Sequence, residues 1–193
     1  FYLQLSIMTI INTIMASRRT VFTMQSLLML LDISQTNGLP SKLHYYVKQG
    51  ILLNPRRGIY AKPEYDLREM ACAVFQPSYI SMEYVLCRSG VTFQYVDEIT
   101  SISYQNRSLE IDGKIYSFRR INPLLWLNTA GIIQEDNIAI ASPERAFLDM
   151  LYLSAGNCYF DNLRVLDKTA IRKILPTYNS VTLNNRVIQL IGF

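Results

Sequence analysis

The chain has 193 residues, half of them hydrophobic and 18% charged, so it can bury a core and is not expected to be disordered. Its formal charge is +4. Its three cysteines, Cys72, Cys87 and Cys158, are widely spaced, and His44 is its one histidine, which excludes a disulfide scaffold and a conventional zinc site. We expect no metal and no cofactor.

The positive charge is concentrated at the N-terminal end. The first 62 residues contain one acidic residue, Asp32, and seven basic ones: Arg18, Arg19, Lys42, Lys48, Arg56, Arg57 and Lys62. The rest of the chain has 12 basic and 14 acidic residues. A locally basic module is what the phosphates of a nucleic acid attract, so this asymmetry favours a nucleic acid as partner.

Residues 1–15 are mostly apolar, and their large side chains recur at helical spacing. The stretch has no basic leader and no cleavage pattern, and it is shorter than the ~20 residues of a spanning helix. We expect a first core helix in a cytoplasmic protein with no membrane association.

Two more helices are predicted before residue 50. Thr23 is a good N-cap for the second, and Pro40 suits the first turn of the third, which ends at Gly50. The third helix turns a polar face outward that carries donors, a cation and an aromatic ring: Ser41, His44, Tyr45 and Lys48, flanked by Lys42 and Gln49. These groups suit base edges and phosphates in a major groove.

A short hairpin follows, with strands at 51–53 and 59–61 and a turn at 54–58 that carries two arginines. Three helices followed by a basic hairpin are typical of a winged helix-turn-helix. The residues expected to contact double-stranded DNA are Arg18, Arg19, Ser41, Lys42, His44, Tyr45, Lys48, Arg56 and Arg57. The alternative is a winged helix that docks a protein and binds no DNA.

Proline and charge replace periodic apolar residues at 62–66, which predicts a linker between a domain at 1–62 and one at 67–193. In the second domain we expect helices at 67–75 and 79–90, the latter capped by Ser78 or Ser81 and closed by Gly90. Strands are expected at 99–104, 108–111, 115–121 and 138–141. Asp112-Gly113 is a strong hairpin turn, and Asp136-Asn137 is a weaker one. The fold class is therefore α+β, a winged helix-turn-helix followed by a mixed domain with a small antiparallel sheet packed on helices.

A buried helix should begin after Ser142, which is its N-cap, with Pro143 in the first turn. Shorter helices are expected at 169–175, capped by Asp167, and at 182–191, capped by Asn179 or Ser180. A cluster of charges accompanies the buried helix: Arg119, Arg120, Glu144, Arg145 and Asp149. These residues either cap and pair within the domain or form a surface that faces a protein partner.

No enzyme motif is present. The sequence has no Walker loop, no Gly-x-Gly-x-x-Gly and no Gly-x-Ser-x-Gly. Glu110-Ile-Asp112 is the nearest approach to paired magnesium ligands, but no Gly-Ser precedes it and Asp112-Gly113 suits a turn better. We expect a protein that is not an enzyme, with a metal-dependent transferase as the remaining enzymatic alternative.

Three stretches resemble the AbiEi family, the antitoxins and transcriptional regulators of type IV toxin–antitoxin (abortive infection) systems. They are Val47-Lys-Gln-Gly-Ile-Leu with Arg57-Gly-Ile-Tyr-Ala61, Tyr79-Ile-Ser-Met-Glu83, and Ala141-Ser-Pro-Glu-Arg-Ala-Phe-Leu-Asp149. The resemblance implies a winged helix that represses its own operon, with two copies on inverted repeats. It also implies a C-terminal domain that neutralises a nucleotidyltransferase toxin without forming a stable complex with it.

Overall fold

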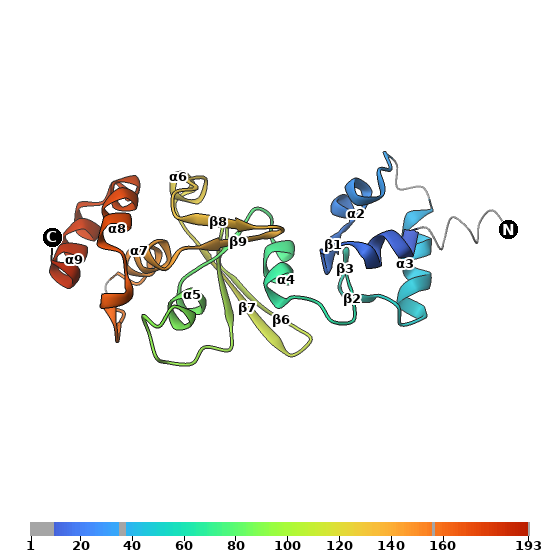
Figure 1. Cartoon of the computed structure of the whole chain (residues 1–193), viewed down its shortest axis with the longest axis horizontal. Coiled ribbons are helices and arrows are strands. Elements are labelled where there is room, and N and C mark those ends of the chain that lie inside the picture. Colours follow the sequence, from blue (N-terminus) through green and yellow to red (C-terminus); the bar gives the residue numbers. More distant parts are fainter. Residues whose placement is uncertain (1–9, 35–37, 156, 193) are drawn as a thin grey trace. The chain divides into compact units, whose positions relative to one another are not determined.

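The computed structural model describes residues 10–34, 38–155 and 157–192, and over these residues the fold is mixed α+β (Figure 1). The chain divides into two compact units, an N-terminal unit that ends at Val74 and a C-terminal unit that begins at Phe75. The sequence placed the division earlier, at 62–67. No helix among the described residues is both long enough and apolar enough to cross a bilayer.

The N-terminal unit combines helices with one small antiparallel sheet of order β1-β3-β2. Its elements are a helical stretch at 10–16, β1 (Val21–Thr23), α2 (Met24–Leu31), α3 (Leu39–Lys48), β2 (Leu53–Arg56), β3 (Ile59–Ala61) and α4 (Leu67–Val74). Its core consists of Ile14, Phe22, Leu27, Leu39, Leu43, Tyr46 and Leu52. The first helical stretch, β1, α2, α3 and the residue before β2 all contribute to this core, so the segment folds as one body.

The local signals for α2 and α3 are confirmed. The Thr23 hydroxyl accepts a hydrogen bond from the Ser26 amide at 3.2 Å, and Pro40 lies in the first turn of α3. Gly50 follows α3 with φ of 71°, a left-handed conformation that glycine adopts without steric cost. Residues 1–9 of the predicted first helix lie outside the described residues, whereas 10–16 are helical.

Two features of the N-terminal sheet differ from the prediction. β1 was not expected, because three residues are too few to show an alternating pattern. The hairpin is tighter than predicted: Asn54, Pro55 and Arg56 belong to β2, and only Arg57 and Gly58 form the turn. Gly58 takes φ of 80°, a left-handed conformation that glycine adopts without steric cost.

α4 belongs to the N-terminal unit because Glu69 ties it to β1. One carboxylate oxygen of Glu69 accepts hydrogen bonds from the Thr20 amide (2.7 Å), the Thr20 hydroxyl (3.0 Å) and the Val21 amide (2.8 Å). Glu69 is almost fully buried. A predicted linker therefore leads into a helix that caps the start of β1.

Substituting Glu69 with alanine should lower the free energy of unfolding of the N-terminal unit by about 2–4 kcal/mol, because a buried carboxylate and its three donors would lose one another. Urea denaturation followed by far-UV circular dichroism measures this loss. Glu64 is exposed, so Glu64→Ala is the matched control and should change stability by less than about 0.5 kcal/mol. Equal stabilities for the two variants would contradict the role of Glu69.

The C-terminal unit is built on a six-stranded sheet of order β6-β7-β5-β4-β9-β8. The strands are β4 (Tyr79–Ile80), β5 (Ile99–Ser103), β6 (Arg107–Ile111), β7 (Lys114–Arg120), β8 (Ile132–Glu135) and β9 (Ile138–Ala141). The helices are α5 (Glu83–Arg88), α6 (Pro123–Trp126), α7 (Pro143–Leu153), η1 (Leu163–Val165), α8 (Lys168–Ile174), η2 (Leu175–Tyr178) and α9 (Val181–Ile191).

The predicted small antiparallel sheet is wrong in size and in type. β4 pairs with β9 in parallel, and β5 pairs with β7 in parallel, so the sheet is mixed. The helix predicted at 79–90 begins instead as β4, and only Glu83–Arg88 is helical. Neither Ser78 nor Ser81 caps α5: its N-cap is Met82, which makes no side-chain capping bond.

Several local predictions for this unit are confirmed. Asp112 and Gly113 both have positive φ, at 50° and 75°, and they join β6 to β7. Ser142 caps α7, Asp167 caps α8 and Ser180 caps α9, each by accepting a backbone N–H. These signals depend only on residues within one turn, which is why they can be predicted from sequence.

α7 is the central helix of this unit. It buries six of its eleven residues, packs with α5 beside the sheet, and contacts α8 and α9 as well (Figure 1). Helices on both sides leave α7 little solvent contact, as its nearly continuous apolar sequence predicts.

Candidate nucleic-acid interface

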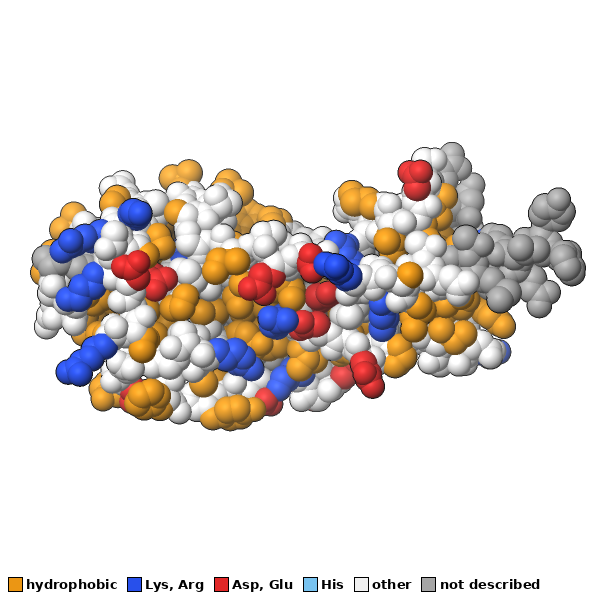
Figure 2. All heavy atoms as spheres, in the orientation of Figure 1, with side chains coloured by type: hydrophobic (Ala, Val, Ile, Leu, Met, Phe, Trp, Pro, Cys, Tyr) orange, Lys and Arg blue, Asp and Glu red, His pale blue; other side chains and the backbone are white. Residues whose placement is uncertain are grey.

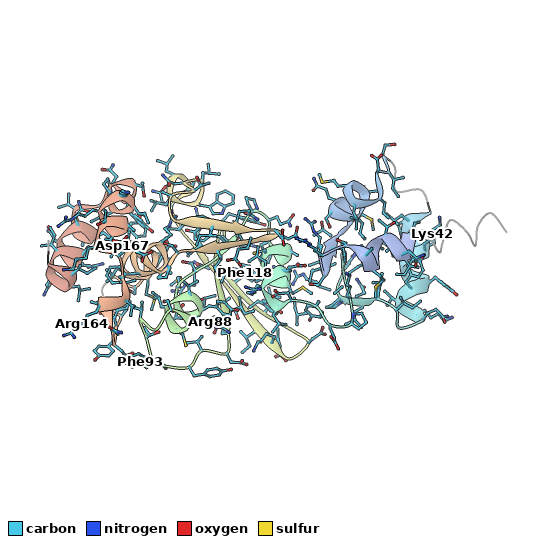
Figure 3. The ribbon with its side chains drawn as sticks, in the orientation of Figure 1. Lys42, Arg88, Phe93, Phe118, Arg164 and Asp167 are labelled. Carbon is cyan, nitrogen blue, oxygen red and sulfur yellow. The ribbon has the colours of Figure 1, made fainter. Side chains whose placement is uncertain are left out.

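The outward face of α3 is the first part of the candidate interface. Leu39, Leu43 and Tyr46 are buried, at the spacing of one side of a helix with about 3.6 residues per turn. The residues predicted to face outward are exposed: Ser41, His44, Tyr45 and Lys48. Lys42 is half-buried at the margin of this face and is labelled on α3 in Figure 3. The predicted orientation of α3 is therefore confirmed.

The hairpin that follows α3 is held in shape by Asn54. Its side-chain amide donates hydrogen bonds to the carbonyl oxygens of Arg56 (2.9 Å) and Ile59 (2.7 Å), on either side of the turn. Arg56 is half-buried in the last position of β2, and Arg57 is exposed in the turn. The Arg57 side chain therefore projects from a backbone whose conformation is fixed.

α3 and the hairpin are joined without a free linker. The amides of Ile51 and Leu52 both donate to the carbonyl oxygen of Tyr46, at 3.0 and 3.3 Å. Leu52 then enters the same core as Tyr46. This close connection makes the end of α3, which carries Lys48, and the start of the hairpin parts of one structural element.

The basic residues of the N-terminal unit differ in their exposure and in the contacts that they make. Arg18, Lys48 and Arg57 are exposed, and none of them forms an ion pair with a described residue. Arg19 is half-buried, and its backbone N–H donates a hydrogen bond to the Ser17 hydroxyl at 3.1 Å. Lys62 donates to the carbonyl oxygens of Met15 and Ser17 at the end of the first helical stretch, so it serves the fold.

The N-terminal unit has few acidic residues, and two of them are bonded to other groups. Glu69 is buried against β1, and Asp66 pairs with Arg68 at 2.8 Å. Burial acts to raise the pKa of Asp66, but the bonds from Arg68 outweigh it and hold that pKa below its usual value. Asp32 and Glu64 are exposed. α3 and the hairpin strands contain no acidic residue.

The charged residues predicted to cluster in the C-terminal unit fall into two groups, one at or near the surface and one buried. Arg119 and Arg120 are exposed at the end of β7, and Glu144 is half-buried and accepts the Asp167 amide at 3.2 Å. Arg145 and Asp149 are fully buried. These two residues cannot form a surface that faces a partner, and their assignment to such a surface is corrected here because they lie inside the unit.

Every donor of the buried Arg145 guanidinium is used. Its Nε donates to Asp149 at 3.1 Å and one Nη donates to the Tyr79 hydroxyl at 2.8 Å. The remaining three bonds go to the carbonyl oxygens of Leu125, Asn128 and Ala130, at 2.9, 3.2 and 3.0 Å. Arginine has five N–H donors, so this set is complete. Arg145 thereby joins α7 to the loop after α6.

Asp149 is saturated in the same way. Besides Arg145, it accepts hydrogen bonds from the hydroxyls of Tyr79 (3.1 Å), Ser81 (2.8 Å) and Tyr178 (2.6 Å). Arg145 and Asp149 therefore connect β4, α7, η2, the end of α6 and the loop after it through one buried network. Arg145 and Asp149 are fully buried and fully hydrogen-bonded, so their role is to hold the unit together.

This network should make the C-terminal unit sensitive to alkaline pH. Burial raises the pKa of Tyr79 and Tyr178, and the charge of Asp149 raises it further. Below the ordinary tyrosine pKa of about 10 both states keep the protons and stability is unaffected; above it, only the unfolded chain releases them. Stability should then fall by about 1.4 kcal/mol per pH unit for each tyrosine.

Urea denaturation at pH values from about 9 to about 11.5 measures this loss, with the fluorescence of Trp126, the one tryptophan, as the probe for the C-terminal unit. Tyr178→Phe should reduce the slope of stability against pH by about half. Tyr159 is exposed and lies outside the network, so Tyr159→Phe is the control and should leave the slope unchanged. An unchanged slope in Tyr178→Phe would show that Tyr178 is not the titrating group.

The described residues include no group of three or more histidine, cysteine, aspartate or glutamate side chains that could hold a metal ion. Neither the protein-family models nor the curated proteins compared with the chain give a match.

Proposed function

We propose that the N-terminal unit is a winged helix-turn-helix that binds double-stranded DNA. A first helical stretch, α2 and α3, followed by the hairpin of β2 and β3 that carries two arginines, supports this proposal. The observation that carries the proposal is the exposure of Lys48 and Arg57, without ion pairs to described residues, on α3 and on the hairpin that follows it.

In this proposal α3 enters the major groove. Ser41, His44 and Tyr45 face the base edges, and Lys42 and Lys48 approach the flanking phosphates. Arg56 and Arg57 on the hairpin contact the DNA backbone or the minor groove. Arg18 and Arg19, which precede β1 in the chain, also contact the DNA backbone. Two copies on an inverted repeat would bring two α3 helices to successive half-sites.

The resemblance to AbiEi extends the proposal to regulation and to toxin neutralisation. The DNA would lie in the protein's own operon, which the bound protein represses. The C-terminal unit would counter a nucleotidyltransferase toxin without holding it in a stable complex. Of the charged cluster, Arg119, Arg120 and Glu144 remain as candidates for that role, since they are not buried.

Titration of a labelled duplex from upstream of the protein's own gene tests DNA binding directly. We expect saturable binding, read by fluorescence anisotropy, that is at least about tenfold tighter than binding to a random duplex of equal length. Equal affinity for the two duplexes would contradict a regulator of its own operon. A stable complex with the neighbouring gene product in the absence of DNA binding would support the protein-docking alternative instead.

Specificity should depend on the outward face of α3. In the double variant His44→Ala with Tyr45→Ala, preference for the upstream duplex over the random one should fall by about 10-fold or more, because base contacts are lost while phosphate contacts remain. Met29, on α2, is exposed, and Met29→Ala is the matched control. If both variants keep the wild-type preference, α3 is not the reading helix.

A further inference from the structure

Helix α6 and the residue after it present two large apolar side chains to solvent. Leu124 is 80% exposed and Leu127 is 67% exposed, whereas Leu125 between them is buried. The two exposed leucines are three residues apart, the spacing that puts side chains on one side of a helical turn. Figure 1 places α6 at the margin of the C-terminal unit, and Figure 2 shows hydrophobic side chains at the surface there. Single exposed leucines are ordinary, but these two form a small apolar patch, the α6 patch.

The backbone that carries the α6 patch is held in place. Asn122 caps α6 by accepting a hydrogen bond from the Leu124 amide at 2.9 Å, and the Trp126 indole N–H donates to the Pro77 carbonyl oxygen at 3.2 Å. The buried guanidinium of α7 donates to the carbonyl oxygen of Leu125 at 2.9 Å. A surface that is already ordered loses little conformational entropy when a partner covers it.

Two arginines precede the α6 patch in the chain. Arg119 and Arg120 are exposed at the end of β7, and neither forms an ion pair with a described residue. Successive strand residues point to opposite faces of a sheet, so one arginine projects on each side. Arg120 comes four residues before Leu124, and a chain spans at most about 3.6 Å per residue, so their Cα atoms lie within about 14 Å of each other. A standard interface covers about 800 Å² on each partner, which is wide enough to include the leucines and the arginines.

No carboxylate in this part of the chain offsets the two arginines. Residues 113–134 contain Lys114, Arg119 and Arg120 and no aspartate or glutamate. Lys114, the first residue of β7, pairs with Asp97. The surface is therefore apolar at α6 and positively charged beside it.

The chemistry of this surface favours one class of occupant. Nucleic-acid bases stack on aromatic rings, and the large exposed side chains at α6 are leucines. A second copy bound about a two-fold axis would bring the same arginines into the interface twice, with no carboxylate from residues 113–134 to pair with them. A protein with an apolar cleft bordered by carboxylates suits both parts, since leucines fill the cleft and arginines bind carboxylates in bidentate geometry.

We propose that Leu124 and Leu127, with Arg119 and Arg120 beside them, form a docking surface for a second protein that has an apolar cleft with a carboxylate rim. The choice of the neighbouring gene product as that protein rests on the function proposed above for the C-terminal unit. A surface of two leucines and two arginines belongs to the small interfaces, below about 1,200 Å², that are typical of transient contacts. A transient contact agrees with a toxin that is countered without a stable complex.

Titration of the labelled full chain with the purified neighbouring gene product, followed by microscale thermophoresis, tests the docking surface. We expect saturable binding with a Kd of about 10 µM to about 1 mM. Leu124→Ser with Leu127→Ser should weaken this binding by at least about tenfold, because the side chains that fill the cleft are lost. Arg119→Gln with Arg120→Gln should also weaken it and should make the affinity less dependent on salt.

Val181 and Ile188, which are exposed on α9, supply the matched control. Val181→Ser with Ile188→Ser removes two apolar side chains elsewhere in the unit and should bind as the wild type does. All the substituted side chains are exposed, so melting temperatures should stay close to that of the wild type. Unchanged affinity in both the leucine and the arginine variants, or no saturable binding by the wild type below about 1 mM, would overturn the proposal. So would a dimer of the chain alone, seen by sedimentation, that the leucine variant dissociates.

Growth of cells that express the neighbouring gene product separates the docking surface from the proposed function. We expect the wild type to protect growth and the leucine variant to lose that protection. Equal protection by the two would overturn the docking surface and leave the antitoxin function standing. Binding that the leucine variant weakens, without protection by the wild type, would support the docking surface and contradict the antitoxin function.

Discussion

Substituting Arg145 with methionine is expected to lower the free energy of unfolding of the C-terminal unit by about 3–5 kcal/mol. The guanidinium is fully buried and satisfies Asp149, the Tyr79 hydroxyl and three carbonyl oxygens. Methionine fills much of the same space but donates no hydrogen bond. Asp149 would then be left as a buried carboxylate without its counter-charge, which costs far more than the pair itself contributes.

Urea denaturation followed by Trp126 fluorescence measures the effect, since Trp126 lies on α6, next to the loop that Arg145 holds. Arg164 is exposed, so Arg164→Met is the matched control and should cost less than about 0.5 kcal/mol. Adding Asp149→Leu to Arg145→Met should recover part of the loss, because the unpaired charge is removed. A loss below about 1 kcal/mol in Arg145→Met would contradict the central role of the network.

The second large effect is on DNA affinity. Arg56→Ala with Arg57→Ala should weaken binding by about 10- to 100-fold on the upstream and the random duplex alike, because phosphate contacts carry no sequence information. Each lost phosphate contact releases about 0.9 fewer counterions, so the slope of log affinity against log salt should become shallower by about 2. Anisotropy titrations at a series of salt concentrations give both quantities.

A control with the same loss of charge separates a local effect from a general one. Arg164 and Lys173 are exposed in the C-terminal unit, so Arg164→Ala with Lys173→Ala removes two positive charges away from the hairpin. This variant should keep nearly the wild-type affinity and salt slope. If it weakens binding as much as the hairpin variant does, net charge rather than the hairpin accounts for binding.

Local signals in the sequence predicted the ends of elements well. Thr23, Ser142 and Asp167 cap helices as expected, because a cap involves only an amide two or three residues away. β4 was missed because it has two residues and its pairing with β9 joins Ile80 to Ile140, far along the chain. Pairing at that distance leaves no local pattern, so the mixed sheet could not be predicted.

The candidate sites show the same division. Helical periodicity alone predicted which side of α3 is exposed. The spacing of Arg145 and Asp149 predicted their ion pair. Their burial involves two tyrosines that are distant in the sequence: Tyr79 lies 66 residues from Arg145, and Tyr178 lies 29 residues from Asp149.

Nuclear magnetic resonance mapping of the upstream duplex on the full chain tests the central claim most directly. Backbone amide signals should shift on α3, between Leu39 and Lys48, and on the hairpin from Leu53 to Ala61, while those of the C-terminal sheet stay in place. Shifts confined to the C-terminal unit, or none at duplex concentrations that saturate binding, would contradict DNA recognition by the N-terminal unit.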